Sequence, residues 1–165
     1  MVRTEISLFL KNVPGEMGKL AQLLGDHDIN IDALTIQDAS EYVRQLFLAR
    51  GKSLKRIASS SSYQSMHKDS VDYALVRLLV NQTDKAVNLL AQEGFIFDIM
   101  PVITLEVENE PGKLAKITQL FGKKNININY LYGSALSENE KYLFVFSPEN
   151  IEQAAEIFQN KNNID

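Results

Sequence analysis

Two short motifs in this sequence combine residue types that could bind a small molecule carrying both a carboxylate and an ammonium group. They are Asn12-x-Pro14-Gly15 and Asn109-x-Pro111-Gly112. An asparagine side chain both donates and accepts hydrogen bonds, proline fixes the backbone φ angle, and glycine lets a ligand approach the backbone closely. Where a helix follows such a turn, its first N–H groups lack partners within the helix and can hold a carboxylate. The candidate binding residues of these turns are Asn12, Val13, Pro14, Gly15, Asn109, Glu110, Pro111 and Gly112.

A second pair of motifs, Ile-Asn-Ile, begins 14 residues after the glycine of each turn. The side-chain oxygens of Asn30 and Asp32 could accept hydrogen bonds from an ammonium group. The second copy has Asn129 in place of Asp32, so the two sites would differ in charge. The candidate binding residues of this pair are Asn30, Ile31, Asp32, Asn127, Ile128 and Asn129. A competing interpretation is that Asn12 and Asn109 only cap the helices that follow them.

Both pairs of motifs belong to an internal repeat of the chain. A shift of 97 residues aligns them without a gap. Farther along, the offset falls from 97 to 69, so the first copy carries 28 extra residues. The pairs aligned at the second offset are Tyr73 and Tyr142, Val76 and Val145, and Ala86 and Ala155. The chain then stops where the second copy would begin its last element.

Hydrophobic periodicity predicts the same elements in both copies. In the first copy we expect strands over 6–10, 29–38, 73–80 and 95–100 and helices over 17–24 and 86–90. In the second copy we expect strands over 103–107, 126–135 and 141–147 and helices over 114–121 and 151–158. Gly25 and Gly122 are expected to end the first helix of each copy in the left-handed conformation. Met17 and Leu114 are expected in the core.

This order of elements predicts the α+β class, with two ferredoxin-like βαββαβ units in tandem. Each unit would have an antiparallel sheet with helices on one face, and the second unit would lack most of its last strand. We expect the first domain over residues 1–100, with an insertion at 40–70 between its second and third strands. The second domain would cover 101–165 and would be truncated at its C-terminal end. The first domain, the insertion or a second chain could cover the sheet edge left open by the missing strand.

The repeated signature of strand, Asn-x-Pro-Gly, helix, Gly and Ile-Asn-Ile resembles the ACT domain, a small regulatory module that binds amino acids. The resemblance covers nearly the whole chain except residues 40–70 and the truncated end. It implies that ligands sit between paired units, with the Asn-x-Pro-Gly loop of one unit facing a strand of the other. It therefore implies up to two sites per chain and a homodimer, and it implies no cofactor.

Composition and motif searches argue against catalysis and against metal binding. The chain has no cysteine and only two histidines, which cannot supply the four ligands of a zinc site. No Ser-His-Asp set and no paired carboxylates are evident, so we expect a protein that is not an enzyme. No apolar run could cross a membrane, and the N-terminus does not resemble a signal peptide, so a cytoplasmic location is expected.

The inserted residues 40–70 carry six basic and two acidic side chains, whereas the whole chain has a net charge of −4. This segment could dock on an acidic protein surface or on nucleic acid. RNA-recognition motifs share the expected fold, but their paired strand aromatics are matched only faintly by Tyr142 and Phe144, so nucleic acid is the less favoured partner. The leading hypothesis is an amino-acid sensor that regulates an enzyme or a transcription factor. An alternative is a regulatory subunit of an amino-acid biosynthetic enzyme such as acetolactate synthase.

Overall fold

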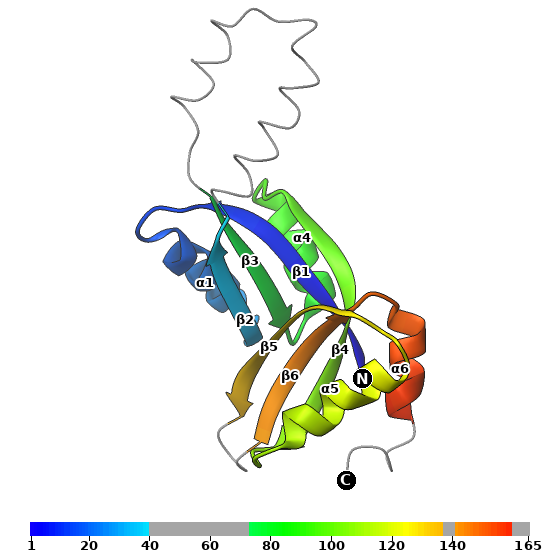
Figure 1. Ribbon diagram of the computed structural model, residues 1–165. Coiled ribbons are helices and arrows are strands. Elements are labelled where there is room, and N and C mark those ends of the chain that lie inside the picture. Colours follow the sequence, from blue (N-terminus) through cyan, green and yellow to red (C-terminus); the bar gives the residue numbers. More distant parts are fainter. Residues whose placement is uncertain (40–72, 137–140, 160–165) are drawn as a thin grey trace, which may run out of the picture.

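A computed structural model describes residues 1–39, 73–136 and 141–159 of the chain. The described residues form one six-stranded antiparallel sheet in the order β2-β3-β1-β4-β6-β5 (Figure 1). The strands are β1 (Val2–Lys11), β2 (Ile31–Asp38), β3 (Tyr73–Val80), β4 (Phe97–Glu108), β5 (Ile128–Leu136) and β6 (Lys141–Pro148). The helices are α1 (Glu16–Asp26), α4 (Thr83–Gln92), α5 (Lys113–Lys123) and α6 (Ile151–Gln159). The α+β class and the tandem ferredoxin-like units are confirmed. The expected insertion at 40–70 lies outside the described residues.

The two repeats share β4, which the periodicity had divided into separate strands over 95–100 and 103–107. The strand is continuous over 12 residues. Its first part pairs with β1 up to Ile103, and its second part pairs with β6 from Ile103 onward. The expected domain boundary between residues 100 and 101 therefore falls inside a strand, and the chain passes from one repeat to the next without leaving the sheet.

The start of β1 partly replaces the missing last strand of the second repeat. The Met1 ammonium group donates to the Thr104 carbonyl at 2.6 Å, and the Thr104 N–H donates to the Met1 carbonyl at 2.7 Å. No strand follows α6 within the described residues, which end at Gln159. The sequence left open whether the first domain, the insertion or a second chain covers the free edge of the second repeat. The first repeat covers this edge of β4 as far as Thr104.

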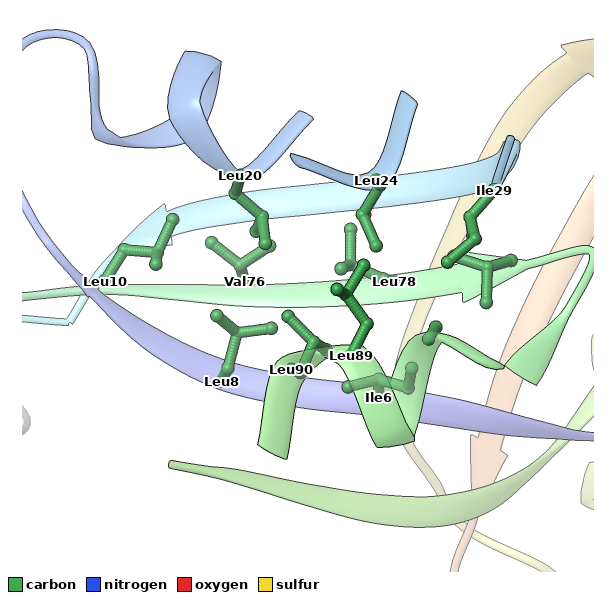
Figure 2. Packing of buried hydrophobic residues seen from close by; sticks show 12 residues of the cluster. Ile6, Leu8, Leu10, Leu20, Leu24, Ile29, Val76, Leu78, Leu89 and Leu90 are labelled. Atoms are coloured by element: carbon green, nitrogen blue, oxygen red, sulfur yellow. The ribbon is translucent and has the colours of Figure 1, made fainter. Parts of the chain in front are cut away.

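Each repeat has its own hydrophobic core between its helices and one face of the sheet. In the first repeat, Leu20 and Leu24 of α1 and Leu90 of α4 point at the buried side chains of β1 and β3 (Figure 2). In the second repeat, Phe121 of α5 stacks on Phe146 of β6 with ring centroids 5.3 Å apart. Each fully buried side chain of this size stabilises the fold by roughly 1.5–3 kcal/mol through removal from water.

The helix-free faces of the two halves of the sheet pack on each other. One buried cluster combines Ala33 of β2 and Leu79 of β3 with Leu143 and Val145 of β6 and Val102 of the shared strand. β2 and β5 lie at opposite edges of the sheet, yet they contact one another. The sheet therefore bends until its two halves face each other, with the helices on the outside (Figure 1).

A buried carboxylate lies within this contact between the repeats. Glu5 of β1 is 0% exposed. Its two oxygens accept hydrogen bonds from the hydroxyls of Tyr130 at 2.6 Å and Tyr132 at 2.8 Å, both on β5. The Arg77 guanidinium lies 3.8 Å from the Glu5 carboxylate and stacks on the Tyr130 ring at 4.1 Å. Because both tyrosines belong to the second repeat and Glu5 and Arg77 to the first, separating the two halves would remove both of these hydrogen bonds from a buried carboxylate.

The register of the second half of the repeat differs by one residue from the sequence alignment. Leu10 lies opposite Ala74, and Val107, its equivalent at offset 97, lies opposite Tyr142. The structural offset is therefore 68, the expected offset of 69 is wrong, and the insertion is 29 residues long. The identity of Tyr73 with Tyr142 is a coincidence, since a slip of one residue moves every side chain of a strand to the opposite face.

The helix ends also differ from the expectation for glycine. Gly25 and Gly122 lie inside α1 and α5, and neither has a positive φ angle. The left-handed positions are Asp28 and Asn125, each with φ of 55°. Aspartate and asparagine are the non-glycine residues that tolerate this conformation best.

We expect Tyr132→Phe to lower the free energy of unfolding by roughly 1.5–3 kcal/mol, because it removes a hydrogen bond to a buried charged group. Tyr142→Phe is the matched control, since that hydroxyl has no hydrogen-bond partner among the described residues, and it should cost less than about 0.5 kcal/mol. Urea denaturation of both variants measures the difference. Equal losses would show that the Glu5 contact does not hold the repeats together.

We also expect stability to fall at alkaline pH. Burial first, and then the Glu5 carboxylate, raise the pKa of the Tyr130 and Tyr132 hydroxyls. Above a pH of about 10 the unfolded chain loses these protons while the folded chain retains them. The free energy of unfolding should therefore decrease with rising pH, and the decrease should be shallower in a Tyr130→Phe/Tyr132→Phe double variant. Identical slopes would contradict the assignment.

Candidate functional site

The two Asn-x-Pro-Gly turns have the same local structure. Gly15 and Gly112 are the N-cap residues of α1 and α5, with φ angles of 94° and 91°. The Lys19 N–H donates to the Gly15 carbonyl at 2.9 Å, and the Lys116 N–H donates to the Gly112 carbonyl at 3.0 Å. Both turns thus connect the end of a strand to the first turn of a helix, as the sequence predicted.

The asparagines of these turns are not helix caps. Both N-cap residues are glycines, which have no side chain to offer. Asn12 and Asn109 are exposed, and within the part of the chain that the structure describes their side chains make no hydrogen bond. The capping interpretation is therefore wrong, and both amide groups face solvent with their donors and acceptors available.

A cavity of about 300 Å³ lies beside the turn of the second repeat. One wall is the turn itself and the start of α5, and the floor is made of Gly133 on β5 and two aromatic rings of β6. The rings of Tyr142 and Phe144 stack with their centroids 6.1 Å apart and an interplanar angle of 19°. The lining residues are Glu108, Asn109, Glu110, Gly112, Lys113, Leu114, Gly133, Tyr142 and Phe144.

The wall of this cavity combines charges of both signs. The Lys113 ammonium lies 3.6 Å from the Glu110 carboxylate, and the Lys113 side chain is only 16% exposed. Glu108 adds a second carboxylate at the end of β4. Lys113 is the first residue of α5, whose first turn contains no acidic side chain. The positive end of the helix and the lysine suit a ligand carboxylate, and the glutamates suit an ammonium group.

The Ile-Asn-Ile segments lie far from the turns of their own repeats. Lys11, next to the first turn, is opposite Tyr73 at one end of β3, whereas Ile31 is opposite Val80 at the other end. At about 3.3 Å per residue, seven residues separate the two by roughly 23 Å. The second repeat has the same arrangement along β6, with Glu108 and Ile128 at opposite ends. The structure therefore does not bring the two sets of candidates together within a repeat.

The side chains of the first segment already have partners inside the protein. Asp32 accepts a hydrogen bond from Arg3 at 2.6 Å and another from the Asn30 side chain at 3.2 Å. The Asn30 N–H donates to the Asn81 side chain at 2.9 Å, and Ile31 packs against the first core. These contacts give the residues of the first Ile-Asn-Ile segment a structural role at the edge of the sheet, without a ligand.

The second segment is similarly engaged through its backbone. The Asn127 carbonyl accepts from the Glu149 N–H at 2.9 Å, as the Asn30 carbonyl does from Asn81. Ile128 packs against the second core, and Asn129 is exposed at an irregularity in β5.

Six of the lining residues were absent from the sequence-based candidates: Glu108, Lys113, Leu114, Gly133, Tyr142 and Phe144. Met17 packs against the first core as expected, but Leu114, also expected in the core, is 37% exposed and lines the cavity. One signal was available in Gly133, because a glycine inside a strand often marks a close approach. A Cβ atom at this position would lie 3.2 Å from the Phe144 ring.

Within the described ranges, no group of histidine, cysteine or acidic side chains could hold a metal ion. None of the helices described is long and apolar enough to cross a membrane.

Comparisons with known proteins identify what the chain is similar to. A family model described as an ACT domain pair matches residues 44–164. The structure of protein BT0572 from Bacteroides thetaiotaomicron matches with a TM-score of 0.70 and 25% identity, over 98% of this chain and 90% of that one. The ligand-free regulatory subunit of aspartate kinase from Thermus thermophilus matches with a TM-score of 0.58 and 15% identity, over 100% and 98%. No curated protein sequence matches.

We expect Gly112→Ala to destabilise the protein by about 1–2 kcal/mol, because the N-cap position of α5 requires a positive φ angle that a Cβ atom disfavours. Gly122→Ala is the matched control. It lies inside the same helix with open space around it, and it should stabilise the protein by about 0.5–1 kcal/mol. Thermal unfolding of the two variants tests the turn geometry, and a loss at Gly122 as large as that at Gly112 would contradict it.

Proposed function

Because the chain belongs to the ACT domain family as a domain pair, we propose that it is a non-catalytic regulatory protein that senses an amino acid. One observation carries the proposal: the cavity between the turn at Asn109–Gly112 and the aromatic rings of β6. Its volume of about 300 Å³ is at the lower end of the range for small-molecule sites. Its wall combines cationic and anionic groups, as a zwitterionic ligand requires.

The regulatory effect would arise from the contact between the repeats. β5 and β6 provide the floor of the cavity on their helix-covered face. On their helix-free face they carry the tyrosines and apolar side chains that pack on the first repeat. A ligand that binds more tightly to one arrangement of these strands shifts the population of the two repeats by that difference in affinity.

The protein that reads this shift would be an enzyme of amino-acid biosynthesis, or a transcription factor. The aspartate kinase regulatory subunit of Thermus thermophilus has the same fold over nearly its whole length. That likeness supports a second candidate function, in which this chain is itself the regulatory subunit of such an enzyme. Purification of the tagged chain from its native cells would recover a large catalytic chain in stoichiometric amount under this second function, and would not do so for a free-standing sensor.

The homodimer, the cytoplasmic location and any docking by residues 40–70 are parts of the same proposal. Large apolar side chains such as Phe9 and Met100 are exposed on the helix-free side of the sheet, and a second copy could cover them. Light scattering measures the molar mass of the protein in solution and so distinguishes a monomer from a homodimer.

If residues 40–70 bind nucleic acid, the affinity should depend steeply on salt concentration, because neutralised phosphates release counterions.

We expect at least one of the twenty amino acids to raise the melting temperature. A ligand at 100 times its Kd stabilises by about 2.7 kcal/mol, which is roughly 5–10 °C for a chain of this size. Asn109→Ala should reduce the shift, because Asn109 lines the cavity. If none of the twenty changes the melting temperature, the sensor function is wrong.

A further inference from the structure

The two repeats differ at several of the positions that form the cavity. With the structural offsets of 97 and 68, Gly133 corresponds to Ile36, and Phe144 corresponds to Val76. Phe144 is half-buried and lines the cavity, whereas Val76 is 0% exposed in the first core. Ile36 replaces the glycine with a side chain that is 47% exposed. The first repeat therefore has no aromatic floor, because Ala74 and Val76 stand where the second repeat has Tyr142 and Phe144.

The charges at the two helix starts are reversed. The first residue of α5 is Lys113, whereas the first residue of α1 is Glu16. Glu16 forms an ion pair with Lys19 at 2.6 Å, and the hydrogen bond from Lys19 lowers the pKa of the Glu16 carboxyl. A carboxylate that is already paired with Lys19 therefore occupies the positive end of α1. The corresponding position of α5 attracts a ligand carboxylate.

The remaining charges of the cavity restrict the ligand side chain. Glu108 and Glu110 together outweigh Lys113, so the wall has a net negative charge. An acidic side chain would be repelled by these two glutamates. The rings of Tyr142 and Phe144 and the side chain of Leu114 add apolar surface to the lining. Flat or branched apolar side chains bury well on such a surface.

We propose that the chain binds one amino acid, in the second repeat only, and that this ligand is neutral with an aromatic or branched apolar side chain. The carboxylate of the ligand lies at the start of α5 beside Lys113, and its ammonium group lies near Glu108. This inference rests on the proposed amino-acid sensing and specifies its stoichiometry and ligand class.

Isothermal titration of the full chain with L-phenylalanine, L-leucine and L-glutamate tests the proposal. We expect one site per chain for at least one of the first two, and binding of L-glutamate at least tenfold weaker. Two sites per chain, or a preference for L-glutamate, would overturn the inference while leaving amino-acid sensing intact. If, in addition, none of the twenty amino acids changes the melting temperature in the thermal screen, both the inference and the proposed amino-acid sensing are wrong.

A matched pair of charge variants locates the site. Lys113→Glu gives the second repeat the charge of the first, and it should weaken binding at least tenfold. Glu16→Lys makes the opposite change at the start of α1, and it should leave the Kd within twofold. Gly133→Ile should also abolish binding, and circular dichroism checks that this variant folds. If Lys113→Glu binds as tightly as the unmodified chain, the ligand is not in this cavity.

Discussion

The hydrogen-bond ladder of β4 is the constraint on which the arrangement of the two repeats depends. A strand of 12 residues pairs with β1 over its first part and with β6 over its second, and Ile103 belongs to both ladders. The repeats are therefore not joined by a linker whose length would permit many orientations. Their relative position is set by the backbone of one strand, and the bend of the sheet then brings its two helix-free faces together.

The inside and the outside of the molecule consequently have different roles. Inside, the Glu5 carboxylate of the first repeat accepts hydrogen bonds from two tyrosines of the second, among apolar neighbours from both halves. Outside, each repeat keeps its own helices and its own turn, and there the two copies have diverged. The cavity of the second repeat shares strands with the internal contact, so a change at the cavity can reach the first repeat through β5 and β6, and through β4, which ends at the cavity.

Much of the fold could be predicted from the sequence because the residues that start and end its strands and helices act locally. Pro14, Gly15 and their counterparts mark the turns, and the apolar spacing marks the helices. Register could not be predicted in the same way, since Tyr73 and Tyr142 are identical yet point to opposite faces. The continuity of β4 and the burial of Glu5 depend on contacts between distant residues. Of the nine residues that line the cavity, three belong to the turn motif, whereas Gly133 and Phe144 of the floor meet only across two strands and have no motif.

If the ligand binds at the start of α5 and not at the start of α1, the backbone amides of the two helix starts should respond differently to it. Hydrogen exchange of these amides, measured with and without a saturating apolar amino acid, shows the difference. We expect slower exchange in the first turn of α5 and along β5 and β6, with the first turn of α1 unchanged. Equal protection of both helix starts, or protection confined to α1, would contradict this expectation.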